Sequence, residues 1–223
     1  MMATTHRRTI GVILCAAAIV AVSGCGGGGG VTTSPPPTSM ASTPSAAVQT
    51  YSSKAFVLPL TVTVDAALKS PPNPDSPNLL SWDSAQPDEG GVRFLVPVEL
   101  YRPGRSLPEP PPKDYEDYLT YLQGLTKNGA KLSSTTKITV DGHPATLMTV
   151  TTDTGIDRSF GCAERGSDKG EGCFGPQPDL LLRMAVIEMG ETTLLAWARV
   201  SKDNPDQAFV AMFEQMLTTV RFG

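Results

Sequence analysis

Alternation of apolar and polar residues marks the first two predicted strands. Residues 60–64 alternate, and a second alternation opens at Gly91 and continues through Val92, Phe94, Val96, Val98 and Leu100. A period of two is typical of a strand with one buried face. Pro97 interrupts the second run, and proline cannot donate a hydrogen bond to a neighbouring strand. We therefore expect this strand at a sheet edge or with a bulge.

A helical period predicts a helix over 114–127. Its apolar stripe consists of Tyr115, Tyr118, Leu119, Leu122 and Leu125. Asp114 is the expected N-cap, and Asn128-Gly129 is expected to end the helix. The acids Asp114, Glu116 and Asp117 suit the positive end of a helix, which explains them better than a metal site or a glycosidase pair.

Two hairpins are expected after this helix. Strands over 131–140 and 144–152 flank Asp141-Gly142, the strongest short hairpin signal in the chain. Strands over 180–188 and 192–200 are apolar at nearly every position, which predicts central strands that are covered on both faces or line a cavity. The chain then ends in a second helix and a short strand over 218–222. We expect Asn204 to cap that helix, with Pro205 in its first turn and Gln207 as capping-box partner.

This order of elements predicts an α+β fold with a mostly antiparallel sheet and helices packed on it. The proline-rich segments 70–77 and 103–112 are expected to be surface loops, because proline excludes them from helices and central strands. A single globular domain is expected over 55–223. Residues 25–54, rich in glycine, serine and proline, predict a flexible tether.

The N-terminus has the layout of a secretory signal. Arg7 and Arg8 precede an uncharged apolar run over 10–22, which is too short for a permanent membrane helix. The following Val22-Ser23-Gly24-Cys25 resembles the bacterial lipoprotein box, in which the cysteine is acylated and becomes the mature N-terminus. The resemblance implies a signal peptide over 1–24 and a lipid, such as palmitate, on Cys25. We therefore expect attachment to the extracytoplasmic side of the cell membrane.

Charge narrows the possible partners. The chain has 18 basic and 22 acidic residues, and removal of Arg7 and Arg8 with the signal leaves 16 basic residues and a net charge of −6. Such a surface repels phosphate backbones, so no nucleic-acid partner is expected. Anionic headgroups would not attract it either. We expect the lipid on Cys25 to provide the membrane attachment.

The cysteine pair Cys162 and Cys173 predicts a disulfide, because the chain is expected outside the cytosol. Zinc is the alternative, but His143 is the only histidine that remains after the signal is removed. We therefore predict no metal and no cofactor. We expect His143 to be an exposed turn residue. The alternative is that it acts as a general base.

Catalytic motifs are weak in this sequence. Ser134-Thr135-Thr136-Lys137 matches the serine-x-x-lysine pattern of penicillin-binding enzymes, but it leads into a predicted strand and its companion motifs are absent. Gly166-Ser167-Asp168-Lys169-Gly170 has the wrong spacing for a nucleophile elbow. A set of large apolar side chains is expected to be core, with an adaptable ligand pocket as the alternative; the set comprises Met148, Met184, Met212, Met216, Phe209, Phe213 and Trp197.

Two segments carry a resemblance to a family. Gly129-Ala130 with 139–145, and the ending 213–222, resemble actinobacterial lipoproteins of the LpqN type. The resemblance covers roughly 90–223 and implies a PsbP-like fold of α/β/α layers. It also implies protein binding or assembly in the cell envelope, without a catalytic site to carry over.

The leading hypothesis is therefore a non-catalytic, lipid-anchored envelope protein that binds another protein. Its expected contact surfaces are the loops 70–77, 103–112 and 162–173, since rigid loops lose less entropy on binding. A carrier of a lipid or other apolar small molecule is the first alternative. A hydrolase without a recognisable motif, acting through Ser134 or Ser167, is the second.

Overall fold

The structure, a computed structural model, describes residues 48–86, 90–166 and 172–223. All of them belong to the second of the two units into which the chain divides, which begins at Pro44. The predicted signal peptide, Cys25, Ser167 and most of the predicted tether lie outside the described residues. Within the described residues, no helix has the length and hydropathy that a membrane crossing needs.

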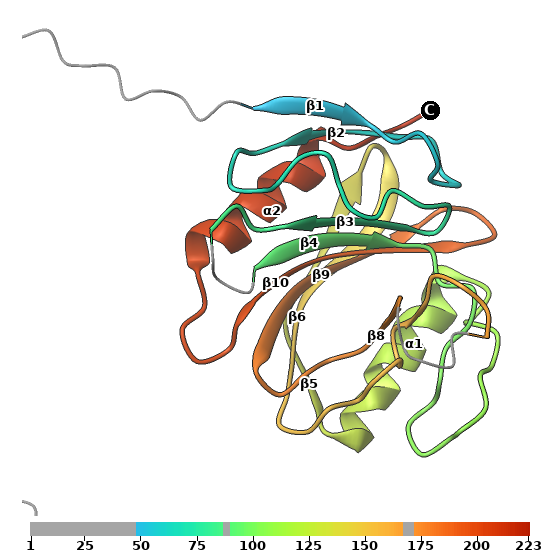
Figure 1. Ribbon diagram of the computed structural model, residues 1–223. Coiled ribbons are helices and arrows are strands. Elements are labelled where there is room, and N and C mark those ends of the chain that lie inside the picture. The colour runs from blue at the N-terminus through green and yellow to red at the C-terminus, as the bar shows by residue number, and fades with distance from the viewer. Residues whose placement is uncertain (1–47, 87–89, 167–171) are drawn as a thin grey trace, which may run out of the picture. The chain divides into compact units, whose positions relative to one another are not determined.

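A six-stranded antiparallel sheet forms the middle layer (Figure 1). Its strands, in spatial order, are β3 (Leu79–Asp83), β4 (Gly91–Leu95), β10 (Thr193–Ser201), β9 (Leu180–Glu188), β6 (His143–Thr152) and β5 (Ala130–Val140). Both predicted hairpins are confirmed, and the hairpin of β9 and β10 is central. A bulge interrupts the pairing of β5 between Ser133 and Thr136. The predicted α+β class with a mostly antiparallel sheet is thus confirmed.

One face of this sheet is covered by helix α2 (Gln207–Thr219) and a smaller sheet of β1 (Gln49–Ser52), β2 (Leu60–Val64) and β11 (Arg221–Phe222). We call it the α2 face. The expected cap at Asn204 is wrong. Asp206 caps α2 instead, because its Oδ1 accepts the backbone N–H groups of Ala208 and Phe209 at 2.9 and 3.0 Å.

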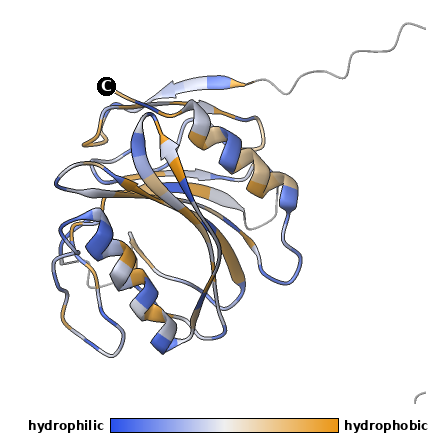
Figure 2. Cartoon of the chain, turned by 180° about the vertical axis from the view of Figure 1, so that it is seen from behind, coloured by the Kyte–Doolittle hydropathy of each residue, from blue (hydrophilic) through white to orange (hydrophobic). Residues whose placement is uncertain are grey.

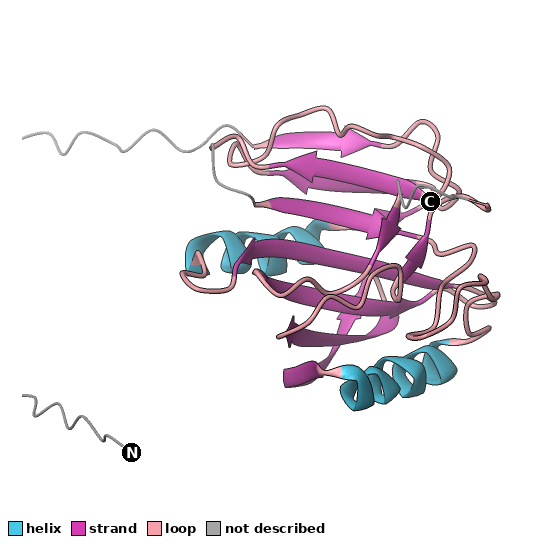
Figure 3. Ribbon diagram, turned by 60° about the horizontal axis from the view of Figure 1, so that its bottom comes forward, coloured by secondary structure: helices cyan, strands magenta, loops and turns pink. Residues whose placement is uncertain are grey.

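The opposite face is covered by helix α1 (Tyr115–Gly124), which continues as the 3-10 helix η1 (Leu125–Asn128), and by irregular segments (Figure 3). We call it the α1 face. The predicted cap is confirmed, because Asp114 accepts the backbone N–H of Asp117 at 2.9 Å. Gly129 ends η1 with a φ of 100°, the left-handed conformation that glycine adopts at low cost.

Each face of the central sheet has its own hydrophobic core, and Figure 2 shows the apolar residues concentrated on its strands. Phe213 and Trp82 are buried on the α2 face, whereas Tyr118 and Trp197 are buried on the α1 face. Cover on both sides explains the unbroken apolar runs of β9 and β10. As predicted, β9 and β10 are central strands, and they are covered on both faces.

The element limits differ from the expectations in three places. The strand that contains Val92 is not at an edge, because β4 pairs with both β3 and β10 and ends at Leu95, before Pro97. Residues 79–83, for which no strand was expected, form strand β3. The tether does not reach residue 54, because β1 pairs with β2 inside the folded unit.

Candidate binding surface

The predicted loops 103–112 and 162–173 lie together on the α1 face, where they form what we call the loop layer (residues 96–112, 156–166 and 172–176). Leu100 and Glu109 exchange two backbone hydrogen bonds of 2.9 and 2.8 Å. On the other side of the same segment, the N–H groups of Val98 and Cys162 donate to the carbonyls of Cys162 and Glu99 at 3.0 and 2.8 Å. The backbone itself therefore joins the two loops.

The disulfide predicted between Cys162 and Cys173 is present. It joins the short strands β7 (Gly161–Cys162) and β8 (Cys173–Phe174), and the Cys162 side chain is fully buried. Glu99 is also buried, and its Oε1 accepts the backbone N–H of Gly166 at 3.0 Å. The disulfide and the Glu99 carboxylate thus fix the described part of the hairpin formed by β7 and β8.

Two tyrosines of α1 hold the same hairpin. The hydroxyl of Tyr118 donates to the carbonyl of Phe160, and the hydroxyl of Tyr121 donates to the carbonyl of Ser159 at 2.7 Å. Burial raises the pKa of Tyr121 to about 12 and that of Tyr118 well above its ordinary value. Both hydroxyls therefore stay protonated and remain donors. The sequence showed Tyr118 only as a member of an apolar stripe, and it did not single out Tyr121.

Glycine is required at two positions where segments of the loop layer pack closely against each other. A Cβ added to Gly161 would lie 2.5 Å from the Cβ of Pro97, and Gly161 has a φ of 126°. A Cβ added to Gly175 would overlap the carbonyl oxygen of Ile156. Pro97 thus packs directly on the hairpin, which explains why this proline follows β4 without belonging to the ladder.

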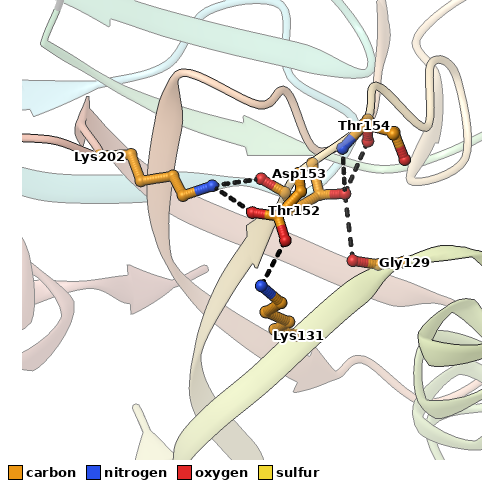
Figure 4. A network of polar contacts seen from close by, with 6 residues as sticks. All are labelled: Gly129, Lys131, Thr152, Asp153, Thr154 and Lys202. Carbon is orange, nitrogen blue, oxygen red and sulfur yellow. Dashed lines mark hydrogen bonds and ion pairs between the residues drawn. The ribbon is translucent and has the colours of Figure 1, made fainter. Parts of the chain in front are cut away.

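A polar network holds the segment that leads from β6 into the loop layer (Figure 4). Lys202 Nζ donates to the Thr152 carbonyl and to Asp153 Oδ1 at 2.6 and 2.8 Å, and Lys131 pairs with the same carboxylate. The hydroxyl of Thr152 donates to the carbonyl of Thr154 at 2.6 Å. Hydrogen bonds from the two lysines lower the pKa of Asp153 to about 2.

The loop layer presents one large apolar side chain to solvent. Leu107, in the loop 103–112, is 75% exposed. The third predicted contact surface, the loop 70–77, is attached elsewhere: Tyr51 and Ser53 donate to the carboxylate of Asp75. Among the described residues, Asn78, just after this loop, bonds to the loop layer twice: its side chain donates to the Ala163 carbonyl at 2.9 Å, and its own carbonyl accepts the N–H of Val96 at 3.0 Å. The structure therefore brings two of the three loops together.

The weaker catalytic candidates of the described residues lie on strands β5 and β6. Ser134 is exposed at the bulge of β5, and Lys137 Nζ donates to the hydroxyl of Tyr115 at 3.1 Å. His143 is not the exposed turn residue that we expected. It begins β6, where its Nδ1 lies 2.9 Å from the Glu188 carbonyl and its ring packs edge-on against Phe222.

The methionines and aromatic residues considered for an apolar pocket belong to the core. Met148, Met184 and Trp197 lie on the α1 face, whereas the members from α2 lie on the α2 face. The six-stranded sheet separates the two groups, so they do not line one pocket. A separate hollow of about 640 Å³ lies beside the start of α2, and only Phe209 of this set reaches it.

Comparison with known proteins gives structural neighbours only. No family model and no curated protein matches the chain. A Pseudomonas aeruginosa protein of unknown function, described as a putative regulator, is 13% identical with a TM-score of 0.41, over 77% of this chain and 94% of that one. Cyanobacterial PsbP (CyanoP) from Synechocystis sp. PCC 6803 is 9% identical with a TM-score of 0.43, over 85% of this chain and 100% of that one. The fold class stated above rests on this chain's own strand pairing.

Proposed function

We propose that this chain is a lipid-anchored cell-envelope protein whose folded unit binds another protein through the loop layer. The observation that carries the proposal is the exposure of Leu107 on a layer that is already ordered by a disulfide and by buried tyrosine hydroxyls. An ordered surface loses little conformational entropy on association. In the proposal, the exposed Leu107 is the apolar side chain that a partner contacts.

The lipid anchor rests on the sequence ending Val22-Ser23-Gly24-Cys25. Two acyl chains on Cys25, at about 0.8 kcal/mol per buried CH₂, suffice for stable attachment. The resemblance of 139–145 and 213–222 to actinobacterial lipoproteins of the LpqN type supports the same reading, with a protein partner in the envelope.

The experiment for the binding surface is capture of partners from envelope extract by the immobilised protein, with partners identified by mass spectrometry. Leu107→Asp should abolish capture, because it places a charge where the apolar anchor is proposed. Val48→Asp is the matched control, since Val48 is 60% exposed but lies outside the loop layer. An unchanged set of partners for Leu107→Asp would contradict the proposed surface.

The anchor has its own test. Cys25→Ala protein should lack the mass of the lipid and should partition into the aqueous phase in a detergent phase separation. If that variant stays in the membrane fraction, Cys25 is not the anchor. The two experiments are independent, because the first can be done with detergent-solubilised protein.

A further inference from the structure

Three arginines line one small pocket at the border of the loop layer. The pocket measures about 270 Å³, and Arg102, Arg105 and Arg158 lie around it together with Asn128 and Tyr101. The chain as a whole is acidic, with a net charge of −4. A local concentration of guanidinium groups on such a protein calls for an explanation other than general solubility.

A tight turn brings two of these arginines together. The N–H of Arg105 donates to the carbonyl of Arg102 at 2.9 Å across Pro103 and Gly104. Gly104 has a φ of 76°, and proline followed by such a glycine is typical of a type II turn. The sequence Arg-Pro-Gly-Arg therefore places both arginines at the ends of one rigid turn.

Packing on aromatic rings orders two of the three guanidinium groups. The Arg158 guanidinium lies 3.9 Å from the centre of the Tyr101 ring, and the Arg102 guanidinium lies 5.1 Å from that of Tyr121. Arg158 also has a φ of 61°, a conformation that non-glycine residues adopt rarely. The polar network around Asp153 includes Thr154 (Figure 4), and the next residue, Gly155, lines the pocket.

Charge in the pocket is only partly balanced by the described residues. Glu109 pairs with Arg102 at 2.6 Å, and Asp157 accepts a hydrogen bond from Gln177. Neither Arg105 nor Arg158 has a carboxylate within 4.0 Å among the described residues. The pocket therefore offers two guanidinium groups that pair with no described carboxylate, and a guanidinium group suits the two oxygens of one anionic group.

We infer that this pocket binds a carboxylate presented by an acidic segment of a partner protein. The inference rests on the proposed function and specifies the chemistry of the partner. Asp157 in the lining and Glu109, which is paired with Arg102, would repel an extended anionic surface such as a bilayer more than a single carboxylate side chain. A volume of about 270 Å³ holds such a group but is too small for a lipid.

The test is an NMR titration of the full chain with a hexaglutamate peptide, observing arginine Nε–H resonances, with a hexaglutamine peptide as neutral control. Hexaglutamate should shift the resonances of the pocket arginines, and hexaglutamine should not. Arg105→Gln/Arg158→Gln should weaken binding of hexaglutamate at least tenfold. Arg105→Gln alone should weaken it several-fold, and this single change on an exposed turn leaves folding intact. The difference in affinity for hexaglutamate between wild type and these variants should decrease as salt is added.

The matched control is Arg165→Gln/Arg221→Gln, which removes two arginines that do not line the pocket and should leave the affinity within twofold. An equal loss in both double variants would show a diffuse charge effect and overturn the inference. Equal binding by wild type and Arg105→Gln/Arg158→Gln would overturn it too. Pocket-dependent binding to phosphatidylglycerol vesicles without binding to hexaglutamate would assign the pocket to a membrane instead.

The pocket and the proposed function fail separately. If Arg105→Gln/Arg158→Gln captures the same partners as wild type while Leu107→Asp loses them, the loop layer binds a partner without the pocket. If hexaglutamate binds at the pocket but Leu107→Asp captures partners normally, the pocket stands and the proposed surface fails.

Discussion

The two faces of the central sheet are covered in different ways. On the α2 face, a regular helix and a three-stranded sheet contribute periodic apolar side chains such as Phe209, Phe213 and Met216. On the α1 face, helix α1 and irregular segments cover the sheet together. A disulfide and two tyrosine hydroxyls that donate to backbone carbonyls hold these irregular segments. Both faces bury an apolar core, but the cover of the α1 face is held in addition by individual polar and covalent links.

The two faces should therefore differ in how much sequence change they tolerate. Regular elements tolerate little change, because each apolar residue fills space in a close-packed core. Irregular segments can vary at their outer residues as long as their few links remain. The exposed Leu107 and the arginine pocket both belong to the second face, which therefore combines ordered backbone with variable surface chemistry.

The largest expected effect is on the α2 face. Phe213→Ala should lower the free energy of unfolding by about 3–5 kcal/mol, because it leaves a cavity under a fully buried ring. Urea unfolding followed by tryptophan fluorescence measures this loss. Phe222→Ala, at a half-buried position on the same face, should cost clearly less. A loss below about 1 kcal/mol for Phe213→Ala would show that apolar burial does not dominate this face.

The next effect concerns the disulfide of the α1 face. Cys162→Ala/Cys173→Ala should lower stability by about 3 kcal/mol, because the cross-link spans 11 positions and restricts the unfolded chain. Hydrogen exchange should accelerate first at Phe160 and Ala163, whose amides donate across the hairpin. A reducing agent should produce the same change in wild type and none in the double variant. Equal acceleration in β2 would argue against a local role.

A smaller effect is expected for one tyrosine hydroxyl. Tyr121→Phe should cost about 1 kcal/mol, because the carbonyl of Ser159 loses a buried donor. Tyr101→Phe is the matched control, since its hydroxyl makes no hydrogen bond to any described residue. Thermal unfolding of both variants measures the difference. Equal stability of the two would mean that the hydroxyl of Tyr121 does not hold the loop layer.

The smallest effect is a pH dependence. The pKa of Asp153 is about 2 in the folded state, below its ordinary value of 3.8, because Lys131 and Lys202 bind the ionised carboxylate. The stabilisation is complete above the unfolded pKa and is lost as the pH falls through the folded pKa. Asp153→Asn should therefore flatten the loss of stability between about pH 4 and pH 2. An unchanged pH profile would contradict this account of the network.

Local signals predicted most of the regular elements. The hairpin at Asp141-Gly142 and the cap at Asp114 depend on residues close in sequence, and both are confirmed. Strand β3 was missed because Leu79 to Trp82 are all buried, so no alternation marks them. The start of α2 was placed two residues early because Asn204 and Asp206 are both good caps, and tertiary structure selects between them.

The candidate site was less accessible from sequence. The cysteine pair was visible, because two cysteines outside the cytosol suggest one bond. Tyr121 and Ser159 are 38 positions apart, however, and nothing in the sequence around either residue indicates that they form a hydrogen bond. Arg105 and Arg158 likewise meet only through the fold. Such contacts need the path of the chain, which composition and spacing do not contain.

Strand β5 lies at one edge of the six-stranded sheet, and most of its side chains are exposed. A free edge of this length is a template on which a strand from a second molecule can add, which is how sheet proteins aggregate. The bulge at Ser134, with its φ of 50°, breaks the row of hydrogen-bonding groups, and Lys131 and Lys137 place charge along it. The bulge and the two lysines therefore disfavour edge-to-edge pairing of two molecules through β5.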